Sequence, residues 1–102
     1  MPIVSTAEIN ERLKHLQGWE FKNLALQKEF VFPTFTDVMI FVNEVAQISE
    51  DLAHHPDIAI HHNNVTLSTT TGDIGGVTEV DFQLANKFQE AEKTVFGEWS
   101  KA

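Results

Sequence analysis

Apolar residues recur along the chain at two spacings, one typical of amphipathic helices and one of half-buried strands. The first helical segment opens on Ser5 and carries Glu8 three residues later, which is the spacing of a capping box. Gly18 follows this segment, and glycine is favoured just beyond a helix end. We therefore predict a short first helix between these residues. Its apolar face consists of Ile9, Leu13 and Leu16.

Two segments with strand-like alternation come next. Residues 19–22 alternate apolar and polar side chains, residues 26–32 end in a strongly apolar run, and a turn near Asn23 would join the two segments. Pro33 ends the second segment, because proline cannot donate a hydrogen bond to a sheet. The pattern predicts a β-hairpin.

A long helix is then predicted to begin at Thr34 or Thr36 and to run to about Ala53. Its apolar residues cover about half of the helical wheel, which is wider than the stripe of roughly 100° that one core requires. The excess predicts burial against a second surface, such as another subunit. Pro56 biases His55 away from helical geometry and ends the element. The apolar residues are Phe35, Val38, Met39, Phe41, Val42, Val45, Ala46, Ile48 and Leu52.

A second hairpin is predicted from residues 57–62 and 65–71, which alternate again. Asn63-Asn64 is the expected two-residue turn, because asparagine tolerates positive φ. Residues 72–76 are rich in glycine and are expected to form a flexible loop.

The last helix is predicted to begin at Thr78, with Asp81 completing its cap three residues later. The order of elements is then α-β-β-α-β-β-α within a single domain, residues 1–102. Such an order predicts an α+β fold with three helices and a four-stranded antiparallel sheet. The last helix also has a wide apolar face, which favours a homo-oligomer. That face consists of Leu84, Ala85, Phe88, Ala91, Val95, Phe96 and Trp99.

Composition narrows the possible chemistry. The 102 residues suffice for one hydrophobic core and include no cysteine, which excludes thiolate nucleophiles, disulfides and cysteine-ligated metal centres. The net charge is −8 and the seven lysines and arginines are scattered, so direct nucleic-acid binding is not expected. No apolar run approaches the ~20 residues that span a membrane, and the first residues lack the pattern of a secretory signal. We expect a cytoplasmic protein.

The stretch from Glu50 to Asp57 places two adjacent histidines at a helix end, directly before proline. One interpretation is structural, since a histidine near a helix C-terminus interacts favourably with the helix dipole. A metal site is disfavoured, because adjacent histidine side chains diverge and no H-E-x-x-H spacing is present. Acid–base chemistry fits the pair better, since imidazole both gives and accepts protons near neutral pH. His54 and His55 are therefore a candidate proton-transfer site.

Three motifs surround these histidines and extend beyond them. They are Glu50-x-x-x-His54-His55-Pro56-Asp57, then Asn63-x-Val65-Thr66, then Gly75-Gly76-Val77-Thr78-Glu79-x-x-Asp81-Phe82-x-Leu84-Ala85. Together they resemble the pterin-4a-carbinolamine dehydratases, and the resemblance covers residues 19–88. Two positions depart from the family pattern: His62 stands where the family has an aromatic residue, and Gly72 stands where it has a third histidine.

The resemblance implies an activity. Such dehydratases remove the 4a-hydroxyl of a tetrahydropterin to give the quinonoid dihydropterin and water, and they need neither a metal nor an organic cofactor. By resemblance, His54 and His55 would be the catalytic acid–base groups, with Glu50 orienting an imidazole. The expected partners are a small-molecule pterin and further copies of the chain in a homodimer or homotetramer, with no nucleic acid and no membrane. The residues that would surround the substrate are Glu50, Pro56, Asp57, Asp73 and Asp81.

Gly72 is the departure that bears most on activity. With Asn63-Asn64 as the turn, position 72 would lie opposite His55 on the neighbouring strand, about 5 Å away. The second histidine pair, His61-His62, would lie roughly 20 Å along the strand and could not replace the missing imidazole. Asp73 or water could supply a substitute. We therefore expect a dehydratase of reduced activity.

The alternative is a non-catalytic interaction module on the same fold. By resemblance, animal members of the family also act as dimerisation cofactors for a homeodomain transcription factor, and some bacterial relatives with degenerate pockets assist the assembly of other proteins. Gly72, His62 and the wide apolar helix faces motivate this alternative.

Overall fold

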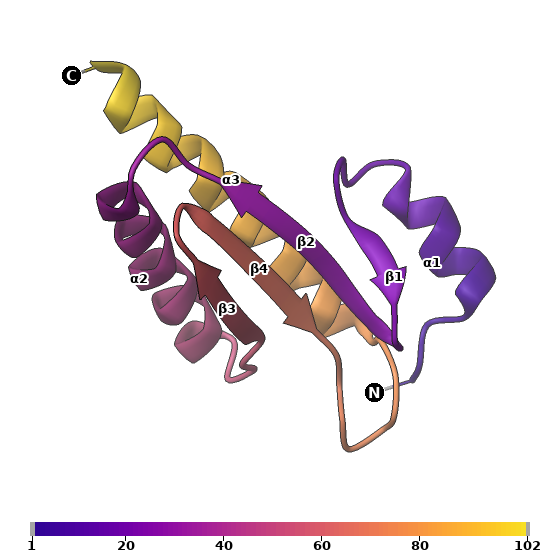
Figure 1. Ribbon diagram of the computed structural model, residues 1–102. Coiled ribbons are helices and arrows are strands. Elements are labelled where there is room, and N and C mark those ends of the chain that lie inside the picture. The colour runs from indigo at the N-terminus through magenta and orange to yellow at the C-terminus, as the bar shows by residue number, and fades with distance from the viewer. Residues whose placement is uncertain (1, 102) are drawn as a thin grey trace.

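Three helices and four strands follow one another in the predicted order. The computed structural model describes residues 2–101, with side chains described as far as Val95. The elements are α1 (Thr6–Leu13), β1 (Glu20–Lys22), β2 (Ala25–Val31), α2 (Phe35–Asp51), β3 (Asp57–His61), β4 (Asn64–Thr69) and α3 (Glu79–Lys101). The strands form one antiparallel sheet in the order β1-β2-β4-β3. Helix α3 crosses behind β2 and β4, α2 packs along α3, and α1 lies beside β1 (Figure 1). The predicted α+β class is therefore confirmed.

The helix starts form as the sequence predicts. The Ser5 hydroxyl accepts a hydrogen bond from the backbone N–H of Glu8 at 3.2 Å, and the Thr34 hydroxyl accepts one from Asp37 at 3.1 Å. Each bond satisfies one of the free amide donors in the first helical turn. Of the two predicted caps of α2, the structure therefore uses Thr34 and not Thr36.

The core lies between the sheet and the two long helices. Four aromatic rings are its largest fully buried side chains: Phe30, Phe41, Phe82 and Phe88. The predicted apolar face of α3 is buried as far as it is described, at Leu84, Ala85, Phe88, Ala91 and Val95. Phe96 and Trp99 lie outside the described side chains. Within residues 2–101, no helix is long and apolar enough to cross a membrane.

Helix α2 keeps part of its wide apolar face uncovered. Phe35 and Met39 are 56% and 38% exposed, and the edge strand β3 likewise exposes Ile58 and Ile60. The fully buried residues of the helix are Val38, Phe41 and Val45. The core of this chain therefore covers only part of the apolar face of α2, as expected of a face wider than one core requires.

The turn of the second hairpin lies one residue earlier than predicted. His61 pairs with Asn64, so the two turn residues are His62 and Asn63. His62 has a φ of +57°, as the first central residue of a type II′ turn does. Asn63 is tied to the end of the first hairpin, because its side-chain amide donates to the Pro33 carbonyl at 3.2 Å.

Cross-strand packing explains this shift. The observed register produces two apolar pairs between β3 and β4, whereas the predicted turn would leave only one. The shift also overturns the predicted pairing of residue 72 with His55, because β3 begins at Asp57 and Asp57 pairs with Ser68. The two apolar pairs are Ile58–Leu67 and Ile60–Val65.

Residues 72–76 form a hydrogen-bonded turn between β4 and α3. The Thr71 N–H donates to the Gly76 carbonyl at 2.9 Å, and the Thr71 carbonyl accepts from Ile74 at 3.1 Å and from Gly75 at 2.9 Å. The predicted loop at residues 72–76 is therefore held together by backbone hydrogen bonds to Thr71.

Replacing His62 by glycine should stabilise the fold, because glycine adopts the positive φ of this turn position without the steric strain of a side chain. We expect the free energy of unfolding in urea to rise by about 0.5–1 kcal/mol. Ala59→Gly, in the neighbouring strand, is the control and should lower it. A loss of stability in His62→Gly would contradict the assigned turn.

Candidate functional site

Helix α2 ends in a Schellman motif that fixes the position of His54. The Ala53 N–H donates to the Glu50 carbonyl at 3.2 Å, and the His54 N–H reaches back to the Ser49 carbonyl at 3.0 Å. Ala53 has a φ of +51°, a conformation usually occupied by glycine. The chain therefore reverses immediately after the helix and brings His54 to the end of β4.

A buried carboxylate stands at the centre of the site. Asp81, in the first turn of α3, has no exposed side-chain surface. It accepts hydrogen bonds from the hydroxyls of Thr69 at 2.6 Å and Thr71 at 2.9 Å. Two further bonds come from the Thr78 backbone N–H and from His54 Nε2, each at 2.9 Å. These four donors offset the cost of burying a charged group.

The ring of His54 is held in one tautomer. Its Nε2 lies 2.9 Å from Asp81 Oδ1 and 3.0 Å from the carbonyl oxygen of Thr70. Both partners are acceptors, so Nε2 carries a proton, and in the neutral ring the lone pair is on Nδ1. The side chain is 19% exposed. His54 is therefore a fixed imidazole with one nitrogen that can accept a proton.

His55 stands next to His54 in a different environment. Its Nε2 is hydrogen-bonded to Glu50 Oε2, which belongs to the last turn of α2. The side chains of His55 and Glu50 are both largely exposed. The family resemblance implies that Glu50 orients an imidazole, and the imidazole to which Glu50 is hydrogen-bonded is that of His55. This second ring can exchange protons with solvent and with a ligand.

Three other predicted site residues, Pro56, Asp57 and Asp73, are not among the hydrogen-bond partners of the two rings, which are Thr70, Asp81 and Glu50. Pro56 is half-buried, and Asp57 is exposed at the start of β3. Asp73 is exposed in the turn before α3. Within the described part of the chain, no group of three or more histidine, aspartate and glutamate side chains could hold a metal ion.

Gly72 borders on open space. A Cβ atom built on it would have no neighbouring atom within 4 Å. Its predicted position opposite His55 is wrong, and the backbone that contacts the histidine pair is that of Thr70, whose carbonyl accepts from His54. His61-His62 lie at the turn end of the hairpin, with ring centroids 4.4 Å apart. They cannot replace a histidine at position 72.

The threonines of the site were missed by sequence reasoning, which treated them as strand formers with polar tips. Thr69 continues the buried alternation of Val65 and Leu67 and is itself 1% exposed. A hydroxyl at a buried strand position requires a hydrogen-bond partner. That requirement was the signal that could have pointed to a buried acceptor such as Asp81.

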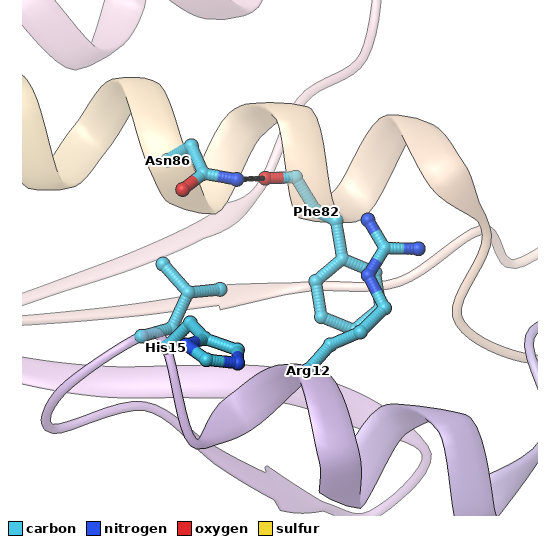
Figure 2. Close-up of a pocket in the computed structure, with 5 residues that line it drawn as sticks. Arg12, His15, Phe82 and Asn86 are labelled. Atoms are coloured by element: carbon cyan, nitrogen blue, oxygen red, sulfur yellow. Dashed lines mark hydrogen bonds between the residues drawn. The ribbon is translucent and has the colours of Figure 1, made fainter.

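A second cluster lies between α1 and α3 (Figure 2). The Arg12 guanidinium lies 3.9 Å from the centroid of the Phe82 ring and donates to Glu79 at 2.5 Å. The bond to Glu79 raises the pKa of Arg12 above its ordinary value. Arg12 therefore holds α1 against the first turn of α3, and none of the predicted site residues lines the neighbouring cavity. That cavity, of about 150 Å³, is lined by Arg12, His15, Leu16, Phe82 and Asn86.

Sequence comparison links the chain to proteins of one family. Residues 2–91 match the sequence model of the family described as pterin 4 alpha carbinolamine dehydratase. A protein from Metallosphaera sedula is 44% identical over 93% of this chain and 99% of its own length. One from Roseiflexus sp. (strain RS-1) is 46% identical over 85% of this chain and 94% of its own length. The names of both assign them provisionally as pterin-4-alpha-carbinolamine dehydratases.

Two solved structures share the fold. A crystal structure described as a transcriptional coactivator/pterin dehydratase from Brucella melitensis has a TM-score of 0.86 at 30% identity, over 89% of this chain and 99% of that one. A pterin dehydratase-like protein described as a RuBisCO assembly factor in the alpha-carboxysome has a TM-score of 0.61 at 20% identity, over 72% of this chain and 86% of that one. At this lower identity the likeness shows the fold alone.

Replacing Asp81 by asparagine should destabilise the fold, because the amide would turn an NH₂ group toward donors that now bond to a carboxylate. We expect the free energy of unfolding in urea to fall by about 2–4 kcal/mol. Asp73→Asn, an equal change at an exposed position of the adjoining turn, should stay within about 0.5 kcal/mol of the unchanged protein. Equal stabilities for the two variants would contradict the central role of Asp81.

Proposed function

The chain belongs to the pterin 4 alpha carbinolamine dehydratase family, and on that premise we propose that it removes water from 4a-hydroxytetrahydropterins to give quinonoid dihydropterins. The observation that carries this proposal is the hydrogen bond between His54 and the buried Asp81. It joins two of the motifs on which the resemblance rests, and it prepares an imidazole for proton transfer.

His54 is the proposed base. Asp81 and Thr70 occupy its Nε2–H, so the ring offers Nδ1 to the substrate. Nδ1 takes the proton from N5 of the pterin, and the electron pair left on N5 forms the double bond between N5 and C4a. The imidazolium that results is stabilised by the Asp81 carboxylate, as in other histidine–carboxylate pairs.

His55 is the proposed acid. Its imidazolium, paired with Glu50, donates a proton to the 4a-hydroxyl as the bond between C4a and oxygen breaks. The hydroxyl then leaves as water. Because His55 and Glu50 are exposed, water can carry the proton taken by His54 back to His55 between turnovers. The half-buried Pro56 and the exposed Asp57 and Asp73 are the proposed neighbours of the bound pterin.

Gly72 is the proposed cause of a reduced rate. The family resemblance places a third histidine, and with it a further acid–base group, at this position, where this chain has a glycine that borders on open space. Asp73, the next residue, is the proposed substitute, since a carboxylate can also hydrogen-bond to the leaving hydroxyl. Within this proposal the enzyme depends on two histidines only.

The second candidate is a protein-interaction module on the same fold, and Gly72 is the observation that favours it. The Brucella melitensis relative is described as both a transcriptional coactivator and a pterin dehydratase. A site that lacks one acid–base group is compatible with the first of these roles. Stoichiometric capture of a protein partner, without pterin turnover, would support this candidate.

We further propose that the chain assembles as a homodimer or homotetramer. The support is the exposed apolar surface of α2 and β3, at Phe35, Met39, Ile58 and Ile60. Covering such a surface by further copies removes apolar area from water. Light scattering of the purified protein measures the assembly.

A cytoplasmic location also remains part of the proposal, in line with a sequence without cysteine.

Turnover of freshly prepared 4a-hydroxytetrahydropterin tests the proposed reaction. The unchanged protein should speed dehydration above the spontaneous rate, and His54→Ala or His55→Ala should lower the catalysed rate by about 10²–10⁴-fold, the usual effect of losing an acid–base group. His15→Ala, at an exposed histidine of the other cluster, is the control and should leave the rate unchanged. If the unchanged protein gave only the spontaneous rate of dehydration, the proposal would be wrong.

Placing histidine at position 72 tests the proposed cause of reduced activity. The space beside Gly72 admits a side chain, so Gly72→His should fold normally and raise kcat by about tenfold, toward the contribution expected of one acid–base group. Gly72→Ala controls for the loss of glycine and should leave kcat unchanged. If both variants fold and neither exceeds the unchanged protein, Gly72 does not limit the reaction.

A further inference from the structure

We propose that Leu24, in the turn between β1 and β2, is an apolar contact for the bicyclic ring of the ligand and sets the affinity for it. The inference rests on the proposed function for the choice of a pterin as ligand. It extends the site from the helix end and β4 to a third segment, which sequence reasoning did not consider.

Leu24 has a backbone conformation that favours glycine. Asn23 and Leu24 have φ angles of +54° and +62°, which together define a type I′ turn. Asparagine followed by glycine is the preferred pair in such turns. The chain has the asparagine and then a branched apolar residue in a conformation that L side chains rarely adopt.

Folding does not account for this leucine. The residue is 59% exposed, so it adds little to the core, and its backbone conformation would be easier for glycine. Residues held at unfavourable φ angles cluster at ligand sites, where the surrounding structure keeps them in place. A leucine that is both exposed and strained is therefore explained best by contact with a ligand.

Thr70 connects the Leu24 turn to the histidine pair. Its hydroxyl donates to the Leu24 carbonyl at 2.8 Å, and its own carbonyl accepts from His54 Nε2 at 3.0 Å. The β1–β2 turn and the end of β4 also lie at the same end of the sheet (Figure 1). Because β4 lies between β2 and β3, the strand that follows the turn and the strand that follows the histidines are two strand spacings apart, about 10 Å. That separation accommodates a bicyclic ring lying across the end of β4.

Ile74 provides a second apolar group beside the same strand end. It is 38% exposed, and its N–H donates to the Thr71 carbonyl at 3.1 Å. The Thr71 hydroxyl in turn donates to Asp81 at 2.9 Å. Leu24 is thus linked to His54 through one residue, Thr70, and Ile74 through two, Thr71 and Asp81. Apolar walls around a few fixed polar groups are the usual composition of a small-molecule site.

The test separates ligand contact from folding by replacing Leu24 with the residue that the turn prefers. Leu24→Gly should have an unchanged or higher melting temperature, yet its dissociation constant for 7,8-dihydrobiopterin, measured by titration calorimetry, should rise about tenfold. Leu24→Met should bind like the unchanged protein. His62→Gly is the matched control, because it makes the same kind of turn change at the other end of the sheet, and it should leave binding unchanged.

Each outcome decides the inference. Equal dissociation constants for Leu24→Gly and the unchanged protein would overturn it, and so would an unchanged protein that binds no dihydropterin. A fall in assembly mass of Leu24→Gly by light scattering, without weaker binding, would assign the leucine to a subunit contact instead. Leucine-dependent binding without any turnover would uphold the contact and reject the dehydratase. If the protein turns over its substrate but Leu24→Gly changes neither the dissociation constant nor KM, the ligand contact is rejected and the proposed dehydratase stands.

Discussion

Asp81 carries a fully buried carboxylate that draws three separate segments of the chain together. It accepts from the Thr78 backbone at the start of α3, from Thr69 and Thr71 at the end of β4, and from His54 beyond the end of α2. A buried carboxylate is tolerated only when its hydrogen bonds are nearly complete, so all three segments must be in place at once. The same bonds that stabilise this corner of the fold also fix the tautomer and orientation of His54. Stability and the proposed chemistry therefore depend on one side chain.

The two adjacent histidines differ because the chain reverses between the helix and the strand. The Schellman motif at Ala53 directs His54 toward the buried carboxylate, whereas His55 remains with Glu50 at the surface. Burial and a fixed hydrogen bond suit one ring to accept a proton from a bound substrate, and exposure suits the other to exchange protons with water. The two proposed roles of this pair thus follow from the chain reversal after α2 and from two different carboxylates, Asp81 of α3 and Glu50 of α2.

The sequence predicts this structure well where the determining interactions are local. The caps at Ser5 and Thr34 and the order of elements follow from spacing and backbone preference. The end of α2 does not follow from Pro56 alone, because the helix stops at Asp51 and the chain reverses at Ala53. The hairpin register does not follow from spacing either, because it depends on which apolar residues meet across β3 and β4. A turn placed one residue too late was enough to set Gly72 opposite His55. The hydrogen bonds that join Asp81 to Thr69, Thr71 and His54 connect residues 10 to 27 positions apart, so spacing alone could not assign them.

The central claim is that Asp81 and the Thr70 carbonyl hold His54 with its proton on Nε2 and leave Nδ1 to accept one. Nitrogen-15 NMR of the histidine rings at a pH where they are neutral measures this directly, since the two tautomers give different chemical shifts for the two ring nitrogens. The structure predicts that His54 is almost entirely the Nε2–H form, with Nδ1 unprotonated. An Nδ1–H form, or the tautomer mixture of a free imidazole, would contradict it.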